Sequence, residues 1–107
     1  MANIVIHVDD VGTIFQLTIV DSDGAIVDVS GATQKNLIFK PPQGTAEIKS
    51  ASFVNTGSDG KIQYTTIAGD IDTQGQWKVQ AYAELSDGNY YSSIITFLVE
   101  KNLATVP

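Results

Sequence analysis

Few side chains in this sequence have the type and spacing that enzyme chemistry requires. The chain of 107 residues contains one histidine, His7, and no cysteine. A Ser-His-Asp triad could therefore use only His7, which has no nucleophile motif beside it, and a zinc site would lack ligands. His7 lies in the first expected strand, which favours a buried or edge-strand histidine. We expect no enzyme activity, no catalytic residue and no cofactor.

Pairs of carboxylates are the next candidates, and they are Asp9-Asp10, Asp21/Asp23 and Asp70/Asp72. Glycoside hydrolysis needs two carboxyl groups that flank a cleft long enough for a sugar chain, which a domain of this size rarely offers. The segment 21–24, Asp-Ser-Asp-Gly, resembles part of a calcium loop but lacks the later ligands and the bidentate glutamate. Because aspartate also caps the amides of its own turn, turn chemistry accounts for these residues. We expect no metal site.

Aromatic side chains could instead form a platform for a sugar. A carbohydrate-binding module would need two or three coplanar, exposed rings from the set Trp77, Tyr82, Tyr90 and Tyr91. Trp77 alternates in phase with Val79 and Ala81, which indicates a core indole. Carbohydrate binding therefore stands as the alternative to the function proposed from the other features below.

The tripeptide Ser-Asp-Gly occurs three times, at 22–24, 58–60 and 86–88, each time between segments rich in β-branched and aromatic residues. Asp-Gly favours tight hairpins, because glycine takes positive φ without steric cost and aspartate tolerates the left-handed region. The repeats predict a meander of antiparallel strands. A polar segment at 67–74 is too long for a hairpin and predicts a crossover between sheets.

Alternation of apolar and polar residues predicts the strands between these turns. The expected ranges are 13–20, 25–27, 35–40, 45–54 with a bulge or break near 50–52, 61–66, 76–85 and 89–99. Seven to eight short antiparallel strands in one domain, residues 1–107, are typical of an all-β, immunoglobulin-like β-sandwich. The inward phase predicts a core of Phe15, Leu17, Ile19, Leu37, Phe39, Ile62, Tyr64, Trp77, Val79, Ala81 and Phe97.

The last expected strand is apolar on both faces. One face carries Tyr91, Ile95, Phe97 and Val99, and the other carries Tyr90, Ile94 and Leu98. A strand of a two-sheet sandwich buries only one face in the core, so a terminal segment or another chain must cover the second apolar face. We therefore expect a homo-oligomer or a larger assembly with interface residues Ile4, Ile6, Tyr90, Ile94 and Leu98.

Charge limits the partners that this domain can have. The formal net charge is −6, and all six cationic residues are lysine. This balance argues against nucleic acid and against an anionic membrane surface, since both require clustered cations. The start of the chain carries no positively charged region and the apolar runs are short, so we expect no signal peptide and no transmembrane helix.

Five segments carry a resemblance to a known family: 15–24, 27–33, 40–44, 60–64 and 69–77. Together they resemble the small immunoglobulin-like domains of tailed-phage structural proteins, in particular the N-terminal domain of upper baseplate proteins. The resemblance covers about residues 12–100. It implies a virion structural module, made in the host cytoplasm, that docks on other virion proteins in baseplate, tail-fibre attachment or capsid decoration.

Overall fold

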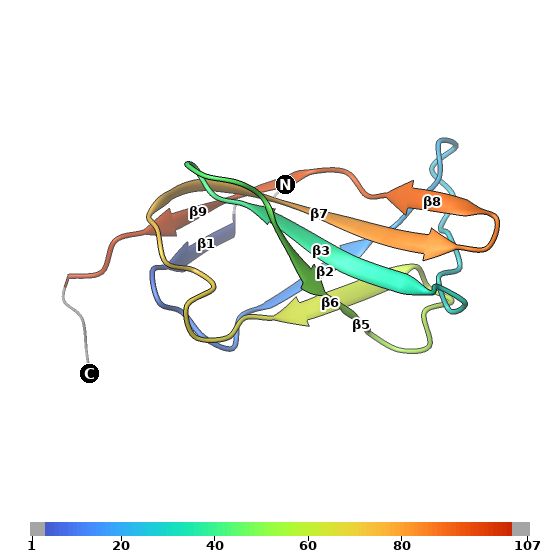
Figure 1. Cartoon of the computed structure of the whole chain (residues 1–107), viewed down its shortest axis with the longest axis horizontal. Coiled ribbons are helices and arrows are strands. Elements are labelled where there is room, and N and C mark those ends of the chain that lie inside the picture. The colour runs from blue at the N-terminus through green and yellow to red at the C-terminus, as the bar shows by residue number, and fades with distance from the viewer. Residues whose placement is uncertain (1–3, 104–107) are drawn as a thin grey trace.

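The computed structural model describes residues 4–103, and this part of the chain consists of β-strands without a helix. The strands are β1 (Ile4–His7), β2 (Ile14–Thr18), β3 (Gln34–Lys40), β4 (Glu47–Ser50), β5 (Ser52–Phe53), β6 (Lys61–Thr65), β7 (Gly75–Leu85), β8 (Gly88–Tyr91) and β9 (Ile95–Glu100). They form two sheets that face each other (Figure 1). The all-β prediction is confirmed. Within the described residues, no helix is long and apolar enough to cross a membrane.

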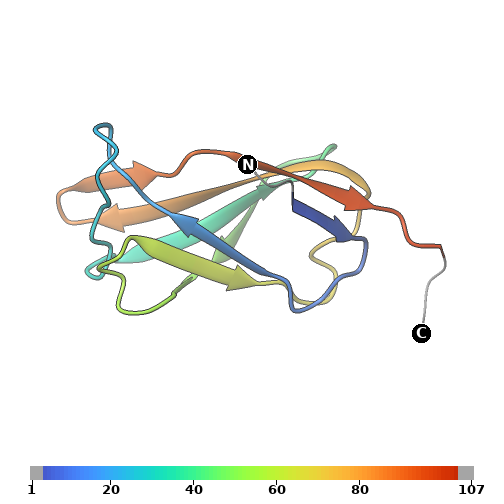
Figure 2. The same cartoon turned by 180° about the vertical axis from the view of Figure 1, so that it is seen from behind.

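The large sheet has six strands in the order β1-β9-β7-β3-β4, with β8 beside the second half of β7. The small sheet has three strands in the order β2-β6-β5. Figure 2 views the molecule from the side of the small sheet. One pair departs from the antiparallel expectation, because β1 runs parallel to β9. These two strands come from opposite ends of the chain, so no tight turn forces them to be antiparallel.

The expected strand 45–54 is divided between the two sheets. β4 pairs with β3 in the large sheet, whereas β5 pairs with β6 in the small sheet. Ala51 lies between them, is buried, and donates its backbone N–H to the carbonyl of Lys35. The break predicted near 50–52 is therefore confirmed, and it is one of the points at which the chain changes sheets. The segment 67–74 makes another such change, from β6 to β7, as the crossover prediction requires.

The expected continuous strand 89–99 is wrong, because the chain leaves the ladder at 92–94. The cause is Ser92, which is buried and whose hydroxyl accepts the N–H of Ala81 at 2.8 Å. The Ser92 N–H in turn donates to the carbonyl of Ala81 at 2.9 Å. After this break the side-chain phase is inverted, so that Tyr90 packs against the core before it and Phe97 after it. Two expected strands are each broken, whereas the expected strand 25–27 is reduced to an isolated bridge between Val20 and Ile26, so residues 4–103 form nine strands in place of seven to eight.

The core lies between the sheets and is held together by aromatic contacts. The Phe15 ring of β2 lies 5.2 Å from Phe39 and 4.8 Å from Phe97, centroid to centroid, so it joins both sheets. Trp77 is the largest fully buried side chain and packs against Phe97 at 5.9 Å. The predicted core is confirmed except for Tyr64, which is only partly buried. The sequence analysis missed the buried residues Ile6, Val29, Ala51, Ile71, Ala83 and Val99.

The three Ser-Asp-Gly segments do not form the same turn. Gly24 and Gly60 take positive φ, at 83° and 73°. Gly88 does not, because it is already the first residue of β8 and pairs with Leu85. The expectation of a left-handed glycine is thus wrong for the third copy, in which the serine and aspartate alone form the loop.

Candidate functional site

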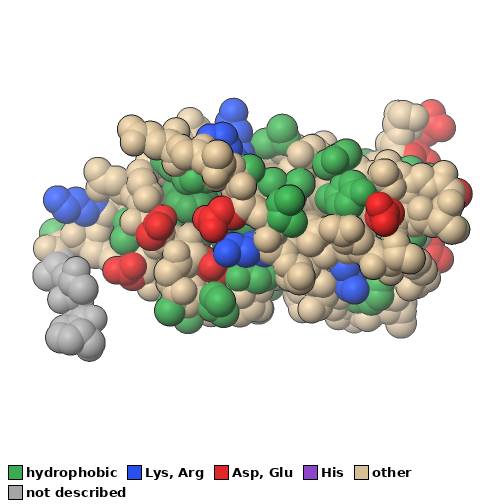
Figure 3. All heavy atoms as spheres, in the orientation of Figure 1, with side chains coloured by type: hydrophobic (Ala, Val, Ile, Leu, Met, Phe, Trp, Pro, Cys, Tyr) green, Lys and Arg blue, Asp and Glu red, His purple; other side chains and the backbone are tan. Residues whose placement is uncertain are grey.

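The surface with the most unusual composition is the outer face of the large sheet, defined as the side that points away from the small sheet. Its exposed apolar side chains are Val5, Ile48, Tyr91, Ile94 and Leu98, with exposed fractions of 47%, 66%, 58%, 58% and 42%. Figure 3 views the molecule from this side and shows hydrophobic side chains gathered over its upper middle. This gathering of exposed apolar side chains makes the outer face the candidate functional site.

Strand register brings these side chains together from distant parts of the sequence. Ile38 of β3 lies directly opposite Ile48 of β4 on one side and Gln80 of β7 on the other. Leu98 of β9 lies directly opposite Val5 of β1 on one side and Gln76 of β7 on the other. Residues opposite each other in a sheet have Cβ atoms roughly 5 Å apart, so the apolar groups form two cross-strand pairs, each of which borders a glutamine of β7.

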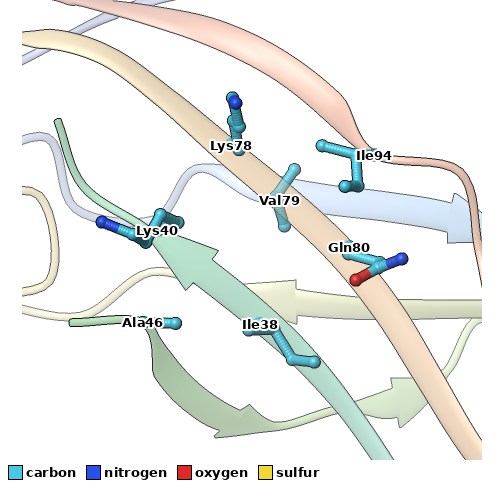
Figure 4. A pocket seen from close by; sticks show the side chains of 7 residues that line it. All are labelled: Ile38, Lys40, Ala46, Lys78, Val79, Gln80 and Ile94. Atoms are coloured by element: carbon cyan, nitrogen blue, oxygen red, sulfur yellow. The ribbon is translucent and has the colours of Figure 1, made fainter.

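A shallow hollow lies on this face where β3, β7 and the segment before β9 meet. Its volume is about 220 Å³, and Ile38 and Ile94 form apolar parts of its wall (Figure 4). Lys40, Lys78 and Gln80 contribute the polar groups. The hollow therefore combines an apolar surface with two cationic side chains.

The two lysines are backbone partners in the β3–β7 ladder, and their side chains extend in different directions from it (Figure 4). Like charges directly opposite each other in a sheet are unfavourable. The Lys40 ammonium donates to the carbonyls of Gly44 at 2.6 Å and Pro41 at 3.4 Å. Neither lysine forms an ion pair with any carboxylate of the described residues. In a chain of net charge −6, this is an uncompensated positive pair beside apolar surface.

The residues predicted for an interface fall into different environments. Ile94 and Leu98 lie exposed on the outer face. Tyr90 is partly buried against the core, and Ile6 is 7% exposed within it, so the chain itself covers both. Ile4 pairs through its backbone with Phe97, and its side chain lies outside the described part of the structure.

Sequence reasoning missed three members of this face. A continuous strand 89–99 places Tyr91 on the same face as Phe97, whereas the break at 92–94 puts it on the outer face. Ile48 and Phe53 are out of phase with each other in the segment 45–54. This mismatch in the sequence indicates that the segment contributes one strand to each sheet. Val5 could be placed only once the pairing of β1 with β9 was known.

The aromatic residues do not form a flat platform. Trp77 is 1% exposed and donates its indole N–H to the carbonyl of Thr73 at 2.9 Å. Tyr82 and Tyr91 are neighbours on the outer face, with centroids 4.8 Å apart, but their rings are inclined by 47°. Burial and the nearby Glu84 carboxylate raise the pKa of Tyr82. These two tyrosines extend the apolar surface rather than offer one coplanar stacking plane.

A buried polar cluster joins the two sheets on the inner side. Asp70, in the crossover segment, accepts the Tyr64 hydroxyl at 2.5 Å and the Ile67 N–H at 2.9 Å, and lies 3.2 Å from the Lys49 ammonium. Burial by itself raises the pKa of Asp70, but these hydrogen bonds and the Lys49 charge outweigh it, so the pKa is lowered. Burial and the same contact raise the pKa of Tyr64 to about 12. The arrangement is that of a structural clamp between β4, β6 and the crossover.

The other candidate groups stabilise local structure. His7 lies on the edge strand β1, with its Nε2 3.5 Å from the Glu100 carboxylate. The Asp21 carboxylate accepts the N–H groups of Asp23 at 2.9 Å and Ala25 at 3.0 Å, as expected for a turn cap. Over residues 4–103, no three His, Cys, Asp or Glu side chains gather in a way that could hold a metal ion.

Comparison with known proteins adds no relative. No protein-family model matches the chain, and no curated protein matches it in sequence.

Proposed function

We propose that this protein is a non-enzymatic docking module that binds another protein through the outer face of its large sheet. The observation that supports this function is the concentration of exposed apolar side chains around the Lys40–Lys78 pair. Apolar surface favours association, and the uncompensated lysines favour a partner that carries an acidic group.

We further propose that the fold is of the immunoglobulin type. In variable-type immunoglobulin domains, one sheet contains strands G, F, C and C′ and the other contains B, E and D. The orders β9-β7-β3-β4 and β2-β6-β5 correspond to these sets strand by strand. The chain departs from antibody domains in having no cysteine and in carrying its buried tryptophan on β7, the strand that corresponds to F.

The biological setting that we propose is a phage virion. The support is the resemblance of five segments to tailed-phage immunoglobulin-like domains, together with the docking face. In this setting the protein is made in the host cytoplasm and attaches to other virion proteins of a baseplate, tail fibre or capsid.

The chemistry of the outer face specifies the partner's surface. Two lysines with no carboxylate partner within the described residues call for an acidic group opposite them, and the surrounding isoleucines call for apolar contact. The occupant that we propose is therefore a virion protein with an apolar surface that carries at least one carboxylate where it meets the lysine pair. A second copy of this chain fits less well, because the lysine pair lies near the middle of the face and a symmetric contact would bring four ammonium groups together.

The test begins with the proteins encoded beside this gene, which we expect to be head or tail proteins. Each is co-expressed with this chain, and complex formation is followed by size-exclusion chromatography with light scattering. We expect one of them to bind, with affinity that falls as salt is added and that drops at least tenfold for Ile94→Lys and for Lys78→Glu. Thr65→Lys, on the exposed side of the small sheet, is the matched control and leaves binding unchanged.

Three results would contradict the proposal. The first is binding that Ile94→Lys, Lys78→Glu and Thr65→Lys affect equally. The second is a self-associated protein in which Ile94→Lys restores the monomer, because the occupant is then a second copy. The third is a gene neighbourhood without virion proteins, which removes the phage setting.

A further inference from the structure

The small sheet ends at β2, and the free edge of this strand is not closed by any strand of residues 4–103. Figure 2 views this sheet, with β2 as its outermost member. Two backbone hydrogen bonds define which groups point toward the edge: Ile19 N–H to the Gly60 carbonyl at 2.8 Å, and Thr66 N–H to the Thr13 carbonyl at 2.9 Å. The odd-numbered residues of β2 therefore exchange hydrogen bonds with β6.

The even-numbered residues consequently present their backbone to the outside. These are Ile14, Gln16 and Thr18, whose N–H and C=O groups point away from β6. Residues two apart in a strand are separated by about 6.6–6.8 Å. A row of alternating donors and acceptors at this spacing is matched by the backbone of another extended strand.

A second cavity lies directly beside this edge. Its volume is about 320 Å³, and it is lined by Phe15 and Leu17 of β2 together with Val79 of β7 and Ile95 of β9. It thus lies between the edge of the small sheet and the inner side of the large sheet. Because the lining is mostly apolar, with Thr13 and Gln16 as its polar members, water in this space gains few hydrogen bonds, and an apolar side chain would replace it favourably.

The free edge of β2 also lacks the protection that β4 and β5 carry at two of the other edges. Segment 13–20 contains no charged residue and no proline. By contrast, the edge strand β4 carries Glu47 and Lys49, and β5 consists of two residues only. Proteins usually protect free edges with charges, prolines or short strands, so an uncharged five-residue edge strand is unusual unless it is used.

We propose that β2 is a strand-addition site, which binds an extended segment of another polypeptide. The segment pairs with the backbone of Ile14, Gln16 and Thr18 and places apolar side chains from alternate positions in the cavity beside Phe15 and Leu17. Its chemistry is therefore an uncharged run of about five residues with apolar side chains at every second position. This site is separate from the outer face of the large sheet and does not depend on the function proposed for that face.

A folded second copy of this chain does not meet these requirements. The two β2 strands could pair antiparallel about Gln16, but the inward side chains of the second β2 remain in its own core. Phe15 and Leu17 are each 4% exposed there, so they cannot enter the cavity of the first copy. The occupant is for this reason an unfolded or flexible segment rather than a second folded domain.

Hydrogen exchange measured by NMR tests the site with defined probes, namely nine-residue peptides that alternate valine or leucine with threonine. In the free protein we expect the Gln16 amide to exchange rapidly, although it lies in a strand, and the Phe15 and Leu17 amides to exchange slowly. Saturating peptide should slow exchange of the Ile14, Gln16 and Thr18 amides at least tenfold. N-methylation of the peptide amides that face β2 should weaken binding on the order of tenfold, whereas N-methylation of the opposite amides should not.

A matched pair of proline variants completes the test. Gln16→Pro removes an N–H that points to the free edge of β2, and we expect it to abolish peptide binding. The control is Ile48→Pro on the edge strand β4. The hydrogen bond from the Ala51 N–H to the Lys35 carbonyl shows that the odd-numbered residues of β4 exchange hydrogen bonds with β3, so the Ile48 N–H points away from β3. This control should bind the peptides normally. If Gln16→Pro does not fold, the N-methylated peptides decide the question on the unchanged protein.

The proposal is overturned if no peptide of the set changes Gln16 exchange at millimolar concentration. It is also overturned if the two N-methylation patterns weaken binding equally. A dimer in which the Gln16 amide is already protected in the free protein would show that a second copy occupies the edge, and would likewise overturn it.

Discussion

The two faces of the large sheet are built from the same strands but have opposite environments. Phe97 is 1% exposed on the inner face, while its neighbour Leu98 is 42% exposed on the outer face. The same alternation separates Val79, at 1%, from the lysine that precedes it on β7. The inner face supplies the core. The outer face keeps apolar groups that the core does not need, so we expect that stability and the proposed docking can be changed separately by mutating adjacent residues.

Among truncations of inner-face side chains to alanine, the largest expected effect is that of Trp77→Ala. It removes the largest buried side chain and its contact with Phe97, so we expect a loss of about 3–5 kcal/mol in the free energy of unfolding. Urea denaturation measures the loss, and Leu98→Ala is the outer-face control, with a loss below about 1 kcal/mol. A Trp77→Ala protein with the wild-type midpoint would contradict the assignment of the inner face.

Asp70→Asn tests the polar clamp at the border of the inner face. The variant loses the ion pair with Lys49 and weakens the hydrogen bonds from Tyr64 and Ile67, so we expect a loss of about 2 kcal/mol at neutral pH. Because the folded-state pKa of Asp70 is lowered, its contribution is present above its unfolded value of 3.8 and is lost as pH falls through the folded pKa. The difference in stability between wild type and variant should therefore shrink below about pH 4. A difference that stays constant from pH 7 to pH 2 would contradict the role of the charge.

The inner face could be predicted from sequence because its signal is local. Alternation in segments 13–20 and 76–85 identifies the inward residues without knowledge of their partners. The outer face depends on register between distant strands, which local alternation does not specify. Lys40 and Lys78 are 38 positions apart in the chain and become neighbours only through the β3–β7 ladder. The phase of the last strand likewise depends on Ser92 meeting Ala81, a tertiary contact.

Lysine substitutions on the outer face should have much smaller effects on stability. Leu98→Lys and Ile94→Lys place a charge where the side chain is already 42% or 58% exposed, so we expect changes within about 0.5 kcal/mol and unaltered folding. Val99→Lys is the adjacent inner-face control; it buries an unpaired charge at a position that is 1% exposed and should prevent folding. Thermal denaturation and circular dichroism compare the three variants. If Leu98→Lys and Ile94→Lys also misfold, the outer face is ordinary core and the comparison of faces fails.

The smallest expected effect concerns the acidic turns, which belong to neither face. The Asp21 carboxylate already accepts two backbone N–H groups, and Asp59 accepts the N–H of Lys61 at 3.2 Å. The hydrogen bond from Lys61 is the largest of the effects that lower the pKa of Asp59, which keeps this acceptor ionised above about pH 4. With their oxygens used in this way, the turns need no cation to fold, so EDTA should leave the melting temperature unchanged. A loss of several degrees that calcium restores would instead make these aspartates metal ligands, and the turns would then join the inner face as a source of stability.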